Sequence, residues 1–174
     1  MGKWFFIPAM ANHRLWAFVT HSPISVLGYL YLLQLSATGI NQGVMALLQG
    51  QNLTLIFWLA LPGMIWEITR KTRAPAAEEA GYQTYSQILG YKGASGMASA
   101  LIMSHLCLTY WLWFSAHLLP HLALAIIFGA AILAYLGTIT AFCFQPERFA
   151  RWLQPVSEIY VAAVLLLYPI QWML

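Results

Sequence analysis

The stretch from residue 15 to residue 66 contains no Lys, Arg, Asp or Glu. A membrane-spanning helix needs about 20 apolar residues, so this stretch is long enough for two spans and the turn between them. The whole chain is 61% hydrophobic and 7% charged, whereas soluble domains are about 25% charged. The composition therefore excludes an ordinary soluble domain and predicts a chain that is embedded in lipid.

The apolar segments predict helices rather than barrel strands. Backbone polar groups in hydrocarbon must be hydrogen-bonded within the protein, which restricts spanning structures to helices and closed barrels. The apolar runs here are longer than the roughly ten residues of a barrel strand. We predict an all-α fold, a polytopic transmembrane helix bundle with about five spans. The predicted spans are 16–39, 53–68, 97–117, 119–144 and 155–174.

The cationic residues predict the orientation. They fall before the first predicted span, after the second and after the fourth, so a five-span chain places all three groups on one side. The positive-inside rule makes this side cytoplasmic, with the C-terminus on the opposite side of a prokaryotic-type inner membrane. This placement explains the net charge of +3 without nucleic acid as a partner. The three groups are Lys3 and Arg14, then Arg70, Lys71, Arg73 and Lys92, then Arg148 and Arg151.

Residues 1–174 are predicted to form a single transmembrane domain, because no repeat or linker divides them. Residues 1–15 are interpreted as an interfacial N-terminal segment with an aromatic anchor. Residues 67–95 are predicted to be a cytoplasmic loop, and they hold seven of the thirteen charged residues. One interpretation of this loop is a solvated, orienting segment with a local ion pair between Glu67 and Arg70 or Lys71. The other is a site for an anionic headgroup or diphosphate.

The sequence of this loop resembles a known family. Glu67-Ile68-Thr69-Arg70-Lys71 is followed by Ala74-Pro75, by Glu78-Glu79 and by the segment GYQTYSQILG, residues 81–90. Together these resemble the second conserved loop of the UbiA superfamily of membrane prenyltransferases. The resemblance covers the C-terminal half of that fold and implies an all-helical bundle that binds an isoprenyl diphosphate. It also implies Mg²⁺ that bridges the diphosphate to acidic residues.

The resemblance assigns expected roles to residues of the loop. The diphosphate and prenyl group would be bound by Arg70, Lys71, Arg73, Tyr82, Tyr85 and Lys92. The metal would be held by Glu67, Glu78 and Glu79, because the chain contains no aspartate. A UbiA-like half-fold would transfer a prenyl group only with a partner half or as a homo-oligomer. The sequence therefore leaves open whether the chain is an enzyme, and it identifies no catalytic residue.

Two further interpretations come from different classes of function. The chain could be a noncatalytic accessory subunit packed against a larger energy-transducing or photosynthetic membrane complex. It could also be a small transporter, which would need polar residues at mid-membrane depth. His105 lies in the third predicted span, where it is either a neutral, hydrogen-bonded histidine or the ligand of a cofactor or pigment. Glu158 is expected to pair with Arg148 or Arg151.

Overall fold

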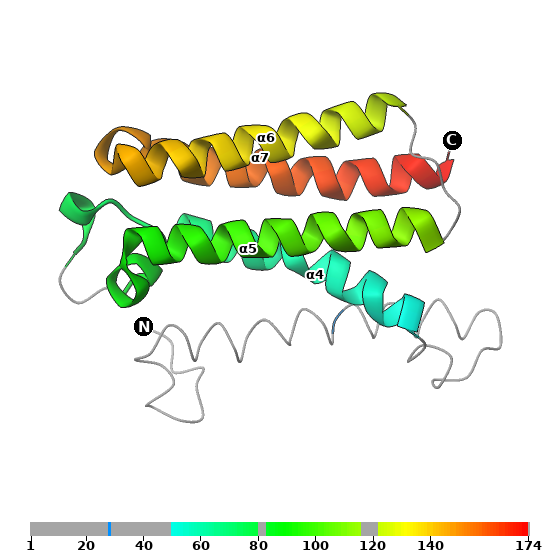
Figure 1. Ribbon diagram of the computed structural model, residues 1–174, viewed down its shortest axis with the longest axis horizontal. Coiled ribbons are helices and arrows are strands. Elements are labelled where there is room, and N and C mark those ends of the chain that lie inside the picture. Colours follow the sequence, from blue (N-terminus) through cyan, green and yellow to red (C-terminus); the bar gives the residue numbers. More distant parts are fainter. Residues whose placement is uncertain (1–27, 29–49, 80–82, 116–121, 174) are drawn as a thin grey trace.

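The computed structural model describes Gly28 and residues 50–79, 83–115 and 122–173. Its elements are α4 (Gly50–Arg70), the short 3₁₀ helix η1 (Pro75–Ala77), α5 (Tyr85–Ser115), α6 (Leu122–Phe144) and α7 (Pro146–Met173). The four long helices run roughly along one axis (Figure 1), and no strand occurs among the described residues. The predicted all-α bundle is therefore confirmed. The predicted segment 1–15 and, apart from Gly28, the predicted span 16–39 lie outside the described residues.

Three of the described helices are long and apolar enough to cross a membrane. They are Leu53–Arg70, Tyr85–Ser115 and Leu122–Phe144, and they include most of the predicted second, third and fourth spans. α7 is not among them, and its first half carries Glu147, Arg148, Arg151 and Glu158. The fifth span, 155–174, stays a prediction. The chain is thus an integral membrane protein by the length and composition of its helices.

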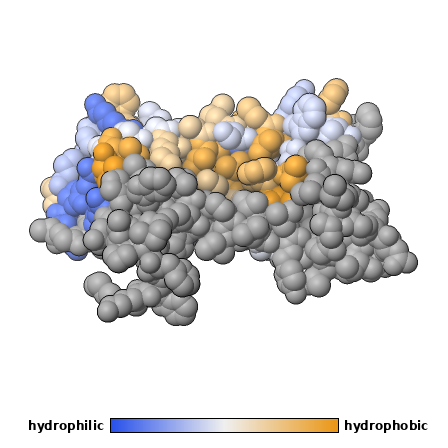
Figure 2. All heavy atoms as spheres, turned by 90° about the horizontal axis from the view of Figure 1, so that it is seen from below, coloured by the Kyte–Doolittle hydropathy of each residue, from blue (hydrophilic) through white to orange (hydrophobic). Residues whose placement is uncertain are grey.

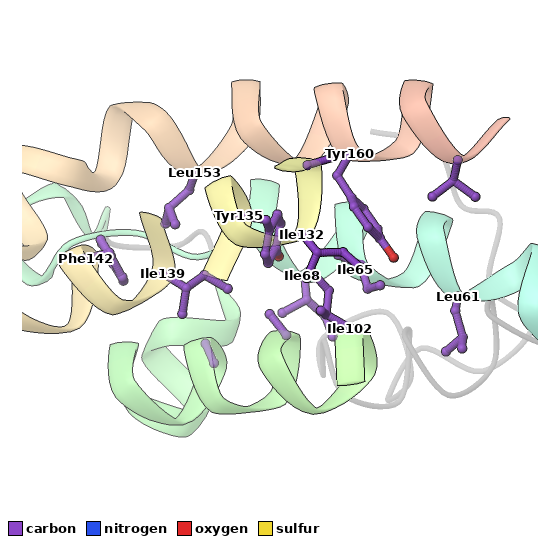
Figure 3. Close-up of a cluster of buried hydrophobic side chains, with 14 of the residues drawn as sticks. Leu61, Ile65, Ile68, Ile102, Ile132, Tyr135, Ile139, Phe142, Leu153 and Tyr160 are labelled. Carbon is purple, nitrogen blue, oxygen red and sulfur yellow. The ribbon is translucent and has the colours of Figure 1, made fainter. Parts of the chain in front are cut away.

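The core lies where the four helices meet. α6 packs along α7, while α4 packs against both α5 and α7. Tyr135 and Tyr160 are nearly inaccessible at the centre of this core, next to isoleucines from α4, α5 and α6 (Figure 3). Large apolar side chains, such as Phe144 and Leu133, are exposed on the outer surface. An apolar exterior around a packed interior is the surface that a lipid environment requires.

α5 begins earlier than the sequence predicted. Segment 67–95 was predicted to be a loop, but α4 continues to Arg70 and α5 begins at Tyr85. The cause is a capping box, in which the Thr84 hydroxyl accepts from the Gln87 amide N–H at 3.1 Å and Gln87 Oε1 accepts from the Thr84 N–H at 3.4 Å. Gly90 then interrupts the helix with a φ of +70°, which a residue without Cβ adopts easily.

α7 also begins earlier than the predicted fifth span. The helix begins at Pro146, directly after α6 ends at Phe144, so Arg148 and Arg151 lie on a helix rather than in a loop. Proline is favourable at a first helical position, because its fixed φ suits the helix and it lacks an N–H that would go unpaired there. The Gln145 carbonyl accepts from the Arg148 and Phe149 amides at 3.2 Å each, which starts the first turn.

Candidate functional site

A cleft of about 580 Å³ opens where α4 ends and α7 begins. We call this the charged end of the bundle, and the most hydrophilic residues visible in Figure 2 gather there. Three segments line the cleft: the last turn of α4, the connection that contains η1, and the first turns of α7. The lining residues are Thr69, Arg70, Thr72, Arg73, Ala74, Ala76, Ala77, Glu78, Glu79, Ala150, Arg151, Leu153 and Gln154.

A hydrogen bond joins the two sides of this end. The amide N–H of Ala76, in η1, donates to Glu147 Oε1, on the first turn of α7, at 3.2 Å. Figure 1 shows η1 and the α6–α7 turn at the same end of the bundle. The second and third cationic groups of the sequence therefore share one end, as the sequence predicted, while Lys3 and Arg14 lie outside the described residues.

Three arginines line the cleft, and their surroundings differ. Arg70 pairs with Glu67 at 2.5 Å, and its guanidinium carbon lies 4.5 Å from the ring centre of Trp66. Arg73 donates through Nη1 to Glu79 Oε1 at 2.6 Å and to the Ala77 carbonyl at 3.3 Å.

The third arginine that lines the cleft is Arg151, which lies on α7. Its guanidinium carbon lies 5.5 Å from the ring centre of Trp152, and within the described ranges no carboxylate forms an ion pair with it. Two of the three arginines, Arg70 and Arg151, thus lie next to an indole ring, a geometry that supports cation–π attraction. Because Arg151 has no carboxylate partner in this part of the chain, it is the arginine best placed to receive an added anion.

The predicted metal ligands do not form one ligand set. Glu67 pairs with Arg70 and Lys71, both oxygens of Glu78 accept from the Thr84 hydroxyl at 2.7 and 2.8 Å, and Glu79 pairs with Arg73. Among the described residues, no three acidic, histidine or cysteine side chains are arranged to hold a metal ion. These three glutamates are engaged by different partners and do not fit a shared Mg²⁺.

The other predicted binding residues lie around the cleft rather than in it. Lys71 forms an ion pair with Glu67, as the sequence predicted. Lys92 is exposed on α5, with its ammonium 5.9 Å from the ring centre of Tyr91. Tyr85 is buried, and its amide N–H donates to the Lys71 carbonyl at 3.2 Å. Tyr82 lies outside the described residues.

The TYSQ part of the motif that suggested the family, residues 84–87, holds in place the segment that lines the cleft. Thr84 is fully buried and joins the capping box of α5 to the carboxylate of Glu78. Ser86 Oγ accepts from the amide N–H of Arg73 at 2.8 Å. These contacts fasten the connection between α4 and α5 to the first turn of α5. The TYSQ sequence therefore positions Arg73 and Glu78, and none of its described side chains lines the cleft.

Several polar residues that sequence reasoning did not assign to the site also line the cleft. Arg151 and Gln154 line the cleft from α7, Thr69 lines it from the last turn of α4, and Thr72 lies two residues after that helix ends. From the sequence, Arg151 was interpreted as an orienting charge and as a possible ion-pair partner of Glu158, and not as part of the site. Its place on α7 could have been found from Pro146 at a first helical position, since Arg151 and Gln154 are then three residues apart and share a face.

Glu158 does not form the predicted ion pair. Its Oε1 accepts from Gln154 Nε2 at 2.8 Å, and the described residues include no ion pair between it and Arg148 or Arg151. Glu158 and Gln154 are four residues apart on α7 and therefore meet on one face. Arg151 is seven residues from Glu158, about 10 Å along the helix axis. Gln154 is therefore nearer to Glu158 than Arg151 is, and it takes the place of the predicted ion-pair partner.

A second polar cluster is buried in the middle of the bundle. His105 is fully buried, its Nδ1 is hydrogen-bonded to the Tyr160 hydroxyl, and its ring centre lies 4.9 Å from that of Trp58. The ring centre of Phe128 lies 5.9 Å from that of the same imidazole. His105 Nε2 has no hydrogen-bond partner within the described part of the chain. An imidazole so enclosed by aromatic rings favours the interpretation as a packed, hydrogen-bonded histidine over that of a cofactor ligand.

A hydroxyl pair lies between this cluster and the cleft. Thr69 donates to the Ile65 carbonyl at 2.6 Å and also contacts the Tyr135 hydroxyl. A threonine has one hydroxyl hydrogen, so Tyr135 is the donor in the second bond. The Tyr135 ring centre lies 5.8 Å from that of Tyr160. Thr69, which lines the cleft, is therefore held by one buried hydrogen bond within α4 and one from α6.

Comparison with known proteins yields no relative. No family model, no curated protein and no solved structure matches the chain.

Proposed function

We propose that this chain binds the terminal phosphate or diphosphate of a polyprenyl lipid in the cleft at the charged end, and that this end faces the cytoplasm. The observation that carries the proposal is the convergence of three arginines, Arg70, Arg73 and Arg151, from three separate segments onto one cleft. The cleft lies at the end of helices that are apolar enough to span a membrane. A ligand there would have its headgroup among cations and its tail in lipid.

The chemistry of the lining suits phosphate oxygens. A guanidinium offers paired N–H donors whose spacing matches two oxygens of a phosphate, and such bonds are stronger than neutral ones. Indole rings are enriched at the boundary between water and hydrocarbon, which suits the Trp66 and Trp152 rings beside Arg70 and Arg151. The resemblance to the UbiA superfamily supports the same ligand class, an isoprenyl diphosphate.

The proposal concerns binding, and prenyl transfer would require a second component. The glutamates of this end are engaged by Arg70, Lys71, Arg73 and Thr84, so they do not supply the metal site on which such a reaction would depend. A partner chain that contributes acidic residues across the cleft would complete the site. The part of the reaction assigned to this chain is to hold and orient the phosphate group.

The test is a binding measurement with matched arginine variants. We expect purified protein in lipid nanodiscs to bind labelled farnesyl diphosphate saturably, and Arg151→Ala to weaken the affinity about tenfold, as expected for the loss of a hydrogen bond to a charged group. Arg148→Ala is the control, because Arg148 is exposed on the same helix but does not line the cleft. Equal affinities for the two variants would contradict the proposal.

A competitor separates a lipid headgroup from a free anion. Inorganic diphosphate carries the same oxygens without a tail, so it should displace the labelled lipid only at much higher concentration. If inorganic diphosphate competes as well as unlabelled farnesyl diphosphate, the ligand is a soluble anion and the lipid assignment is wrong.

A second candidate function is that of a noncatalytic accessory subunit in a larger membrane complex. The observation that favours it is the engagement of Glu67, Glu78 and Glu79 by neighbouring side chains, which leaves no group of metal ligands among the described residues. Gentle detergent extraction distinguishes the two functions. A stoichiometric larger assembly without saturable binding of farnesyl diphosphate would favour the subunit, whereas binding by the isolated chain would exclude this candidate as its sole role.

A further inference from the structure

Glu158 lies level with the interior of a membrane span. It stands two residues before Tyr160, which points from α7 into the core (Figure 3). The Tyr160 ring centre lies 5.8 Å from that of Tyr135 and 6.5 Å from that of Phe128. Both of these residues are at least six positions from either end of α6, a helix that is apolar enough to span the membrane. Glu158 itself is exposed, so it presents a carboxylate on the outer side of the bundle at this depth.

A carboxylate in this position is costly unless another group compensates its charge. A charged side chain within hydrocarbon costs about 2.5–3.5 kcal/mol on insertion scales, and such side chains almost always face other protein groups or water. Glu158 accepts a hydrogen bond from the neutral amide of Gln154 at 2.8 Å. Among the described residues, no ion pair includes Glu158. The described part of the chain therefore leaves its negative charge uncompensated.

The sequence provides no cation at this depth. No Lys or Arg occurs in residues 15–66, 93–147 or 152–174, so every cation of the chain lies outside the predicted spans. The nearest one along α7 is Arg151, which is about 10 Å away along the helix axis, toward the charged end. A second copy of the chain would bring the same carboxylate and no cation to match it. A compensating cation therefore has to come from a different molecule.

The outer face of α7 around Glu158 has the spacing of a helix-packing seam. Four exposed residues follow one another there at intervals of three, four and three positions. Residues at such intervals form one stripe along a helix, the arrangement by which helices pack side by side. One of the four is alanine, a small residue that lets a neighbouring backbone approach closely in a membrane. We call the four residues the outer stripe of α7: Pro155, Glu158, Ala162 and Leu165.

The inner face of α7 shows the same kind of spacing. Its buried residues alternate at intervals of four, three and four positions, and α7 packs against α6 and α4. These buried residues are Leu153, Ser157, Tyr160 and Val164. The outer stripe lies on the opposite side of the helix, where α7 has room for one further helix.

We infer that the outer stripe is a docking surface for a transmembrane helix of another protein, and that this helix carries a Lys or Arg that pairs with Glu158. Charge complementarity selects this occupant. Lipid headgroups stay at the membrane surface, so lipid offers no cation at the depth of Glu158. A cation and a carboxylate that pair within the membrane compensate each other. The inference goes beyond the phosphate-binding function, because neither the cleft nor its ligand enters into it.

The experiment measures association with a synthetic transmembrane helix in phosphatidylcholine vesicles, by energy transfer between fluorophores on protein and peptide. The probe is a Trp-flanked Leu–Ala peptide with one Lys about 10 Å inside its apolar stretch, and the reference peptide has Leu at that position. We expect the wild-type protein to bind the Lys peptide about three- to tenfold more tightly, the range of coupling between polar side chains in membranes.

Two variants show whether this preference belongs to Glu158. Glu158→Gln keeps the size and the hydrogen-bonding capacity of the side chain but removes its charge, so it should abolish the preference for the Lys peptide. Glu147→Gln is the control and should keep the preference, because Glu147 is exposed on the first turn of the same helix, at the charged end.

Three outcomes would overturn the inference. Equal affinity of the wild-type protein for the two peptides would mean that water or a proton satisfies Glu158. A preference that persists in Glu158→Gln, or that is also lost in Glu147→Gln, would mean that the effect does not depend on this position. Energy transfer between two differently labelled copies of the protein, dependent on Glu158 and excluding the Lys peptide, would assign the outer stripe to a second copy instead.

Discussion

Replacement of Thr84 by valine should loosen the wall of the cleft without changing its shape. Valine is nearly isosteric with threonine but has no hydroxyl, so the variant removes the bonds to Glu78 and to the Gln87 amide together. Loss of a helix N-cap costs about 1 kcal/mol. Loss of a hydrogen bond to a carboxylate costs about 1.5 kcal/mol, less here because Glu78 is partly exposed. We expect a total of about 2 kcal/mol.

Hydrogen–deuterium exchange at the first turn of α5 measures this loss locally. A free energy of about 2 kcal/mol corresponds to about a 30-fold faster exchange of the Gln87 amide, if local opening limits exchange. Thr84→Ser keeps the hydroxyl and should leave the rate near that of the wild type. Thr138→Val is a second control, because Thr138 is only partly buried and donates to the Ala134 carbonyl of its own helix. A Gln87 rate in Thr84→Val equal to the wild-type rate would refute the reasoning.

Two further predictions concern stability in detergent, measured by thermal unfolding. Tyr160→Phe should destabilise the protein by about 1–3 kcal/mol, because His105 Nδ1 loses its hydrogen-bond partner in a buried site. Tyr110→Phe is the control and should have little effect, because Tyr110 is 70% exposed. Gly90→Ala should lower the free energy of unfolding by about 1–2 kcal/mol, because Gly90 has a φ of +70°. Gly96→Ala is the control and should be neutral or stabilising, because there is open space for a Cβ at Gly96. Similar unfolding temperatures within either pair would contradict these assignments.

The arrangement of apolar segments was predictable because the bilayer restricts the fold so strongly. The predicted second span, 53–68, lies within α4, and the predicted fourth span ends at Phe144 as α6 does. The helix starts were less predictable. The first turns of α5 and α7 are rich in polar residues, so hydropathy placed them in loops, whereas a capping box at Thr84 and a proline at position 146 start both helices.

The candidate site could be predicted only in part. Arg70 and Arg73 were identified from the loop sequence, and the structure places both on the cleft. The contribution of Arg151 and Gln154 depends on contacts between segments far apart in the chain, which no local pattern reveals. The pairing of Glu79 with Arg73, across η1, likewise depends on the path of the connection. Local spacing did predict the ion pairs of Glu67 on α4, because both partners lie one turn away.

The central claim is that two segments distant in sequence build one cleft on the cytoplasmic side of the membrane. Cysteine labelling tests it most directly, with Lys92→Cys and Arg148→Cys introduced singly after Cys107 and Cys143 are replaced by serine. A membrane-impermeant thiol reagent should label both positions in inside-out vesicles and neither in right-side-out vesicles. Labelling of the two positions from opposite sides would contradict the shared cleft, and labelling of both only from the outer side would contradict its cytoplasmic location.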